Sequence, residues 1–252
     1  MRPVLPAALL AFAAAMTGWP GPVTAQVVDG WGWTVIIPSV TGTDHIGLHL
    51  RELARQRDNG GEAPDPAANA PQATMPDPAV LRYTPSKTRR TANLARFVEQ
   101  SRRIDPAGAA SLQTLFASGD IIDRIGAQLA PHGLRVDDLA DTYAVWWITA
   151  WQATRGSNAE TSDRTNMAVR AQAARALVGI GTIAQASDAA KQELAESLLI
   201  QTMLIDAAVE QAKGNPSQLA AVGAAAGQGA RGMGLDLSTM DLTEQGFVIG
   251  AE

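Results

Sequence analysis

The sequence predicts an all-α protein, an orthogonal or irregular bundle of about six helices, and three observations point to that class. From Ser86 onward, capping residues and glycine or proline stops separate segments of helical length. The apolar residues of these segments recur every three or four positions, and alanine occupies many of the positions between them. Residues 31–38 alternate as a strand does, which predicts one short isolated strand beside the helices.

The helix predicted for residues 137–155 should lie at the centre of the bundle. Asp137 is expected to be its N-cap, and Gly156 can end it in the left-handed conformation. Apolar residues cover more than half of its circumference, so several neighbouring helices should bury it. A narrow strip of the helix is polar: Asp138, Asp141, Thr149 and Gln152. The structural core is expected to include Tyr143, Trp147, Ile148 and Trp151 of this helix and Leu94 and Phe97 of the first helix.

The same capping and spacing arguments place the other helices. They are expected at residues 86–103, 106–118, 121–129, 163–178, 188–213 and from 216 onward. The helix at 188–213 is apolar nearly all round at its middle, which predicts a second buried helix. The residues that follow the last helix are expected to form an extended strap, anchored by Phe247.

The chain is expected to divide into three parts. Residues 1–25 have the features of a signal peptide: a positive charge at Arg2, a short apolar run, and small residues before a cleavage site after Ala25. Residues 26–80 are expected to be an extended or disordered segment and linker, and residues 81–252 to be the helical domain. The apolar run is too short for a permanent membrane span, so the predicted location is periplasmic or secreted.

Composition excludes several classes of function. The chain has no cysteine, which excludes disulfides, thiolate catalysis and cysteine-bound zinc. Its net charge of −5 argues against a nucleic-acid partner, because neutralising phosphates needs a basic surface. Gly227, Gly229 and Gly232 have the spacing of a dinucleotide-binding loop, but alanines precede them where that motif needs a strand. We therefore expect no cofactor.

His45 and His49 are weak candidates for a metal site. Residues four apart share one face of a helix, which is the geometry of a two-histidine site. Gly47 weakens a helix between them, and the glutamate of the hydrolytic motif is absent. We expect two surface histidines and no bound metal.

Arginine side chains form a stripe on one face of the first predicted helix. Arg89, Arg96 and Arg103 lie seven residues apart, so they line up along the helix. One interpretation is a docking surface for an anionic partner, such as a component of the cell envelope or another protein. The other is a solvated face that is partly paired with nearby aspartates.

The segment from Tyr83 to Gly156 resembles an exported bacterial family of unknown function, DUF6683. The residues that carry the resemblance are Arg89, Arg90, Asn93, Leu94, Phe97, Val98, Leu115, Phe116, Gly119, Asp120, Ile122, Gly133, Leu134, Ala140, Asp141, Tyr143, Ala144, Trp147 and Trp151, with Leu242, Thr243, Gly246 and Phe247 near the end. The similarity is expected to cover the helical domain without the N-terminal linker. It implies one exported helical domain and no particular activity.

Any catalysis in this chain would have to use carboxylates or hydroxyl groups. Asp120 and Asp123 lie one helical turn apart, and Asp138 and Asp141 repeat that spacing, so either pair is a weak candidate for a general acid and base. All four occupy the first turns of helices, where aspartate is also expected for capping. We therefore favour a non-enzymatic interaction module over the alternative, a cell-envelope hydrolase that uses paired aspartates.

Overall fold

The computed structural model describes residues 77–179 and 181–249. The predicted signal peptide, the strand predicted at residues 31–38, and His45 and His49 lie outside the described residues, as does nearly all of the predicted linker.

The described part is helical, which confirms the predicted all-α class. Its seven helices of nine residues or more are α3 (Lys87–Arg102), α4 (Pro106–Ala117), α5 (Ile121–Leu129), α6 (Leu139–Ala153), α7 (Asp163–Gly179), α9 (Asp188–Ala212) and α10 (Pro216–Gly232). Shorter elements are α8 (Gly181–Ala184) and the 3-10 helices η2 (Pro78–Leu81), η3 (Ala130–His132) and η4 (Leu237–Thr239). The chain then forms a hairpin of β1 (Met240–Thr243) and β2 (Gly246–Ile249). None of the helices in the described part is long and apolar enough to cross a membrane.

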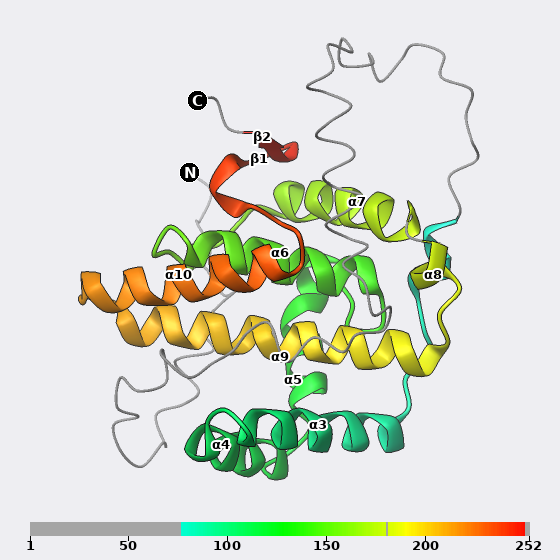
Figure 1. Ribbon diagram of the computed structural model, residues 1–252. Helices are drawn as coiled ribbons and strands as arrows, with labels where there is room; N and C mark the ends of the chain where they lie inside the picture. Colours follow the sequence, from blue (N-terminus) through cyan, green and yellow to red (C-terminus); the bar gives the residue numbers. More distant parts are fainter. Residues whose placement is uncertain (1–76, 180, 250–252) are drawn as a thin grey trace, which may run out of the picture.

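Helix α6 lies in the middle of the molecule, as predicted. It packs against α7 on one side and against α9 and α10 on the other (Figure 1). Helices α3 and α4 pack on each other, and α3 also contacts α9 on the side away from α6. Helix α9 therefore separates α6 from the pair formed by α3 and α4.

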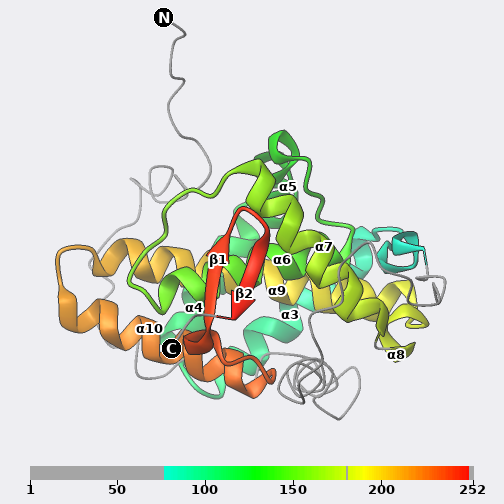
Figure 2. The ribbon, with the colours of Figure 1, turned by 90° about the horizontal axis from the view of Figure 1, so that it is seen from above.

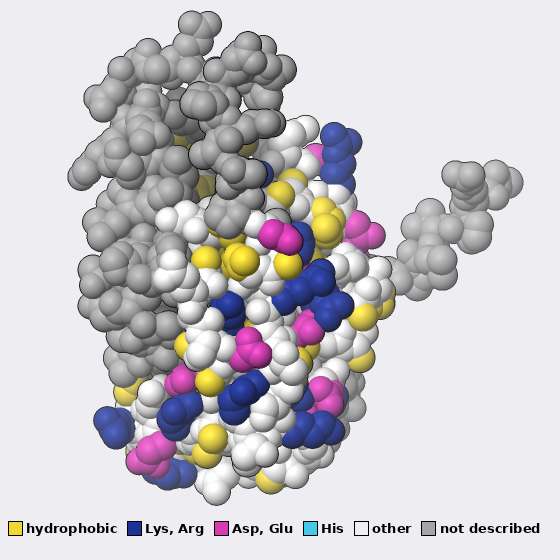
Figure 3. Space-filling view, turned by 90° about the vertical axis from the view of Figure 1, so that its right-hand side faces the viewer, with side chains coloured by type: hydrophobic (Ala, Val, Ile, Leu, Met, Phe, Trp, Pro, Cys, Tyr) yellow, Lys and Arg dark blue, Asp and Glu magenta, His cyan; other side chains and the backbone are white. Residues whose placement is uncertain are grey.

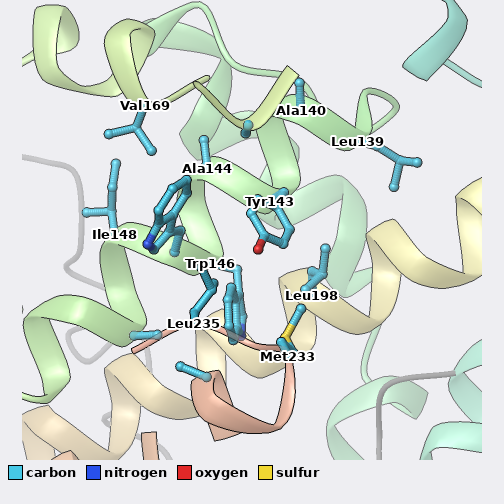
Figure 4. Close-up of a cluster of buried hydrophobic side chains, with 14 of the residues drawn as sticks. Leu139, Ala140, Tyr143, Ala144, Trp146, Ile148, Val169, Leu198, Met233 and Leu235 are labelled. Atoms are coloured by element: carbon cyan, nitrogen blue, oxygen red, sulfur yellow. The ribbon is translucent and has the colours of Figure 1, made fainter. Parts of the chain in front are cut away.

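Two hydrophobic clusters share α9, because this helix is apolar around most of its circumference. The larger cluster gathers side chains of α6, α7, α9, α10 and the hairpin. In it, Tyr143 and Trp146 of α6 lie near Leu198 of α9, with Met233 and Leu235 closing the space beyond α10 (Figure 4). The smaller cluster joins α3, α4 and α5 to the opposite face of α9. Of the expected core residues, Tyr143, Trp147, Ile148 and Phe97 are buried, whereas Trp151 and Leu94 are half-buried.

The N-cap of α6 is Asp138, and the prediction of Asp137 is wrong. The Asp138 carboxylate accepts a hydrogen bond from the N–H of Ala140 at 2.9 Å. The backbone of Asp138 pairs with Arg82 in an isolated antiparallel bridge, which holds it in an extended conformation. The helix can therefore begin only at Leu139. Asp137 instead forms an ion pair with Arg135 at 2.6 Å.

The C-terminal segment is a β-hairpin where the sequence predicted an extended strap. Its strands pair in register from Met240 with Ile249 to Thr243 with Gly246. The hairpin lies over α6 and α7 (Figure 2). Phe247 is its buried anchor, with its ring stacked on Trp147 at 4.4 Å between centroids. The hairpin thus covers part of the aromatic face of the central helix.

Glycine lets α10 approach the end of α6 closely. A Cβ atom at Gly223 would lie 2.8 Å from the carbonyl oxygen of Ala153 and 3.2 Å from Cα of Thr154. The three glycines with dinucleotide-loop spacing all lie within α10. They form no loop, in agreement with the interpretation of the sequence.

Candidate functional site

Arg90 brings together one of the two predicted aspartate pairs. Its Nη1 donates to Asp120 Oδ2 at 2.5 Å and to Asp123 Oδ1 at 2.7 Å. Its Nε donates to Glu196 Oε1 of α9 at 3.1 Å. The Arg90 side chain is 8% exposed and that of Glu196 is 1% exposed. One buried guanidinium therefore ties α3 to both α5 and α9.

Asp120 pairs with Arg90 and is also the N-cap of α5. Its Oδ1 accepts hydrogen bonds from the N–H groups of Ile122 and Asp123, each at 3.1 Å. Burial disfavours its charged form, but these backbone hydrogen bonds and the Arg90 guanidinium outweigh burial and lower the pKa of Asp120. A lowered pKa keeps this carboxyl ionised, which suits a cap and an ion pair and does not suit a general acid.

Two side-chain amides donate hydrogen bonds to the Glu196 carboxylate. Asn93 Nδ2 donates to Glu196 Oε2 at 2.7 Å, and Gln192 Nε2 donates to Oε1 at 2.8 Å. Gln192 also bonds the backbone N–H and carbonyl of Ser86, the N-cap of α3. This network fixes the start of α3 on α9.

The second aspartate pair is held by Arg170 of α7. Arg170 Nε donates to Asp141 Oδ1, and its Nη2 lies 3.1 Å from Asp138 Oδ2. Arg82 Nε lies 3.4 Å from the same Asp138 oxygen, and the backbone N–H of Arg135 donates to Asp141 Oδ2 at 2.9 Å. Both carboxylates are 1% exposed. This pair joins α6 to α7 at the start of the central helix.

Burial gives Asp141 an unusual pKa. Burial raises its pKa, and the neighbouring Asp138 carboxylate adds to that effect. The Arg170 guanidinium acts in the opposite direction but does not cancel them, so the pKa is about 6. A pKa in this range is typical of general acids.

The arginine stripe is partly used inside the fold. Arg89 Nε donates to Gln192 Oε1 at 2.9 Å, and Arg96 pairs with Glu193 at 3.0 Å, so both contact α9. Arg103 is exposed, and its guanidinium makes no hydrogen bond or ion pair with another described residue. Acidic and basic side chains are interspersed on the face shown in Figure 3. The stripe is therefore less uniform than its spacing predicts.

A pocket of about 70 Å³ lies where the polar strip of α6 faces α9. Its apolar wall consists of Ile125, Leu129, Leu134, Val145, Ile148, Leu199 and Met203. Its polar side consists of Gln128, Thr149, Gln152, Glu160, Thr161, Asn166, Thr202 and Asp206, with Ala159 beside them. The two aspartates of the polar strip bind Arg170, while Thr149 and Gln152, farther along the same strip, line this pocket.

Hydrogen bonds hold the loop between α6 and α7 over the polar side of the pocket. Gln152 Nε2 donates to the carbonyl oxygen of Ala159 at 2.5 Å. Asn158 Nδ2 donates to Asp206 Oδ1 at 3.1 Å and to Glu210 Oε2 at 3.0 Å. The loop is thereby attached to both α6 and α9.

Asp206 is the residue that sequence reasoning missed. It lies in the C-terminal third of α9 and is 2% exposed. Its Oδ2 is buried and accepts no hydrogen bond from a described residue. Burial raises its pKa, and the hydrogen bond from Asn158 opposes that effect, so the pKa is about 6. A carboxylate directly after the mostly apolar run 198–205 was the available signal in the sequence, because isolated buried charges are costly.

The described residues thus form a mainly helical fold with one β-hairpin, joined by buried ion pairs and containing a small amphipathic pocket. The chain belongs to a family of unknown function, DUF6683, whose model matches residues 6–250. The match includes the N-terminal segment, so it extends beyond the helical domain to which the resemblance was expected to be limited. No curated protein and no solved structure matches the chain.

Proposed function

We propose that this chain is an exported, non-enzymatic interaction module, which binds a ligand or partner without transforming it. The main support is the state of the two aspartate pairs. Asp120 accepts hydrogen bonds from two N–H groups of its own helix and Asp138 from one, and each pairs with an arginine. A general acid or base needs an oxygen that can reach the substrate. Asp120, Asp138 and Asp141 instead use their oxygens to hold helices together, and Asp123, whose side chain is 58% exposed, pairs with Arg90 through Oδ1.

The alternative is a cell-envelope hydrolase that uses paired aspartates. Its support is the raised pKa of Asp141, which lies next to a second carboxylate. Against it, Asp141 is almost inaccessible, and its two oxygens accept hydrogen bonds from Arg135 and Arg170. A substrate would have to displace these bonds to reach the carboxyl group.

Export rests on the first 25 residues. A positive start, an apolar run and small residues before Gln26 are what a signal peptidase recognises. N-terminal sequencing of the protein recovered outside the cytoplasm tests this. We expect the mature chain to begin at Gln26, in the periplasm or the medium. A chain that keeps Met1 and stays in the cytoplasm would contradict export.

The arginine stripe of α3 is a candidate surface for contact with a partner, in addition to the pocket. Arg103 is the member of the arginine stripe whose guanidinium remains available to an anionic envelope component or an acidic protein. Arg89 and Arg96 would first have to leave their contacts on α9.

Turnover assays distinguish the module from the hydrolase. The mature chain is incubated with purified peptidoglycan and envelope polysaccharide, and products are sought by mass spectrometry. Asp120→Asn and Asp141→Asn are assayed in parallel, at a temperature at which circular dichroism shows both to be folded. We expect no products from any of the three. Products that the wild type makes and either variant does not would establish the hydrolase.

A further inference from the structure

The pocket between α6 and α9 contains a negative charge without a counter-ion. Asp206 is buried, and among the described residues its carboxylate accepts a hydrogen bond only from the neutral amide of Asn158. The basic residue nearest to it in the sequence is Lys213, the C-cap of α9, which forms an ion pair with Glu210. Among the described residues that line the pocket, none is lysine, arginine or histidine.

The loop side of the pocket carries a second acidic residue. Glu160 lines the pocket and is exposed, so it lies on the solvent side while Asp206 lies within the protein. Thr202 donates its hydroxyl hydrogen to the carbonyl of Leu198, which leaves its oxygen able to accept a hydrogen bond. The polar side of the pocket is therefore rich in hydrogen-bond acceptors and has a negative charge.

The opposite wall has the size and character to contact a short hydrocarbon group. It is formed by aliphatic side chains and Met203. A buried water needs roughly 10–15 Å³ of comparable space, so the pocket of about 70 Å³ accommodates several waters or one small organic molecule. The pocket is too small for a sugar chain or a peptide.

From these observations we infer that the pocket binds a small organic cation, a primary ammonium with a short apolar chain, whose charged group pairs with Asp206. The apolar chain lies against Val145, Leu199 and Met203. The inference deepens the proposed interaction module and rests on it, since it names the class of ligand that the module binds.

The charged groups around Asp206 set the pH dependence of binding. Glu160 on the loop and Glu210 on α9 add negative charge, Lys213 is paired with Glu210, and Asn158 is neutral. Asp206 binds a cation only when it is ionised, and its pKa is about 6. Affinity should therefore fall about tenfold for each pH unit below that pKa.

The experiment uses the chain without its predicted signal peptide and the probe n-butylammonium chloride. Binding is followed by amide chemical shifts in a titration at about pH 7, with sodium chloride as the ionic-strength control. We expect saturable shifts at the residues that line the pocket. The uncharged probe n-butanol, which has the same chain, should bind at least about tenfold more weakly, because it forms no ion pair.

Three variants show whether the pocket is responsible. Asp206→Asn keeps the size of the side chain but removes its charge, and should weaken binding at least about tenfold. Asp241→Asn changes an exposed carboxylate of the hairpin and should bind as the wild type does. Ala159→Leu enlarges an exposed loop residue at the pocket, and should weaken binding without altering the fold. This last variant provides the test if Asp206→Asn does not fold.

Equal affinity for n-butanol and n-butylammonium would overturn the inference. So would Asp206→Asn or Ala159→Leu binding as tightly as Asp241→Asn, or the absence of saturable shifts in the folded wild type. None of these results would affect the proposed non-enzymatic role, which is tested separately: products made by the wild type in the turnover assay would contradict it.

Discussion

Arg90 shows how much of this fold depends on one side chain. Its guanidinium has donors pointing in several fixed directions, so it can bind carboxylates of α5 and α9 at the same time. The spacing of the arginine stripe selects Arg89 and leaves Arg90 out, and the charge of the first helix does not identify Arg90 either. The distinction depends on Glu196, which is 106 residues away in the sequence.

Replacing Arg90 with alanine should destabilise the protein by about 3–5 kcal/mol, because Glu196 would be left as a buried charge without its counter-ion. Arg102→Ala is the control. Its ion pair with Glu99 is exposed, and its loss should cost less than about 1 kcal/mol. Urea denaturation measures both values. Equal losses in the two variants would show that the buried network does not stabilise the fold.

Asp206 should make the wild type less stable as the pH rises. Its pKa is raised from 3.8 to about 6, so the folded state holds a proton at pH values where the unfolded state has released it. The associated stability is present below pH 3.8 and is lost as the pH passes through about 6, a loss of about 3 kcal/mol at most. The pKa of Asp141 is also raised to about 6, so Asp141 likewise lowers the free energy of unfolding as the pH rises.

Comparison with Asp206→Asn isolates the effect of Asp206, because every other titrating group is present in both proteins. The free energy of unfolding of the wild type minus that of the variant should decrease as the pH rises from about 4 to about 7. Urea denaturation at several pH values gives this difference. A difference that is constant with pH would mean that Asp206 has an ordinary pKa in the folded protein.

At the scale of the elements, the close contact between α10 and α6 predicts that replacing a helical glycine with alanine destabilises the protein, although alanine has the higher helix propensity. Gly223→Ala should destabilise the protein by about 1–3 kcal/mol, because its Cβ would collide with the backbone at Ala153. Gly227→Ala, one turn away, has its nearest atoms at 3.5 Å or more and should stabilise the helix by up to about 1 kcal/mol. Thermal unfolding of both variants tests the close approach. Stabilisation by both would contradict it.

Most helix boundaries could be predicted because they depend on local chemistry. Ser86, Asp105, Asp120, Ser187 and Asn215 each accept a hydrogen bond from the start of the helix that follows, as their residue types predict. The start of α6 was misplaced by one residue because a non-local bridge decides it. The hairpin was predicted as a strap because its short strands have little pattern of their own and gain their stability by packing on α6 and α7.

The pocket could be predicted only in part. The polar strip of α6 was visible in the sequence, and it does contribute Thr149 and Gln152 to the pocket. The rest of the lining comes from apolar residues of α6, from Leu134 before it, from α5, α7 and α9, and from the loop after α6. Their meeting depends on how α9 joins the two hydrophobic clusters, which periodicity does not specify.

At the scale of the whole molecule, the hairpin should stabilise the larger hydrophobic cluster through Phe247. Phe247→Ala removes a ring stacked on Trp147 and should cost about 3 kcal/mol. The tryptophan fluorescence should also shift to longer wavelength as Trp147 gains contact with water. Val248→Ala, on the neighbouring and largely exposed side chain, should leave both values nearly unchanged. Unchanged fluorescence and stability in Phe247→Ala would contradict the packing of the hairpin on α6.

The central claim is that the paired aspartates hold the fold and do not perform catalysis. The most direct test is the free energy of unfolding of Asp120→Ala, compared with that of Asp105→Ala. Asp105 caps α4 without an arginine partner, so its loss should cost about 1 kcal/mol. Asp120→Ala loses a cap and a partner of buried Arg90, and should cost clearly more, about 2–4 kcal/mol. If Asp120→Ala is as stable as the wild type or more stable, the claim is contradicted. Removing a catalytic carboxylate often leaves a protein equally or more stable.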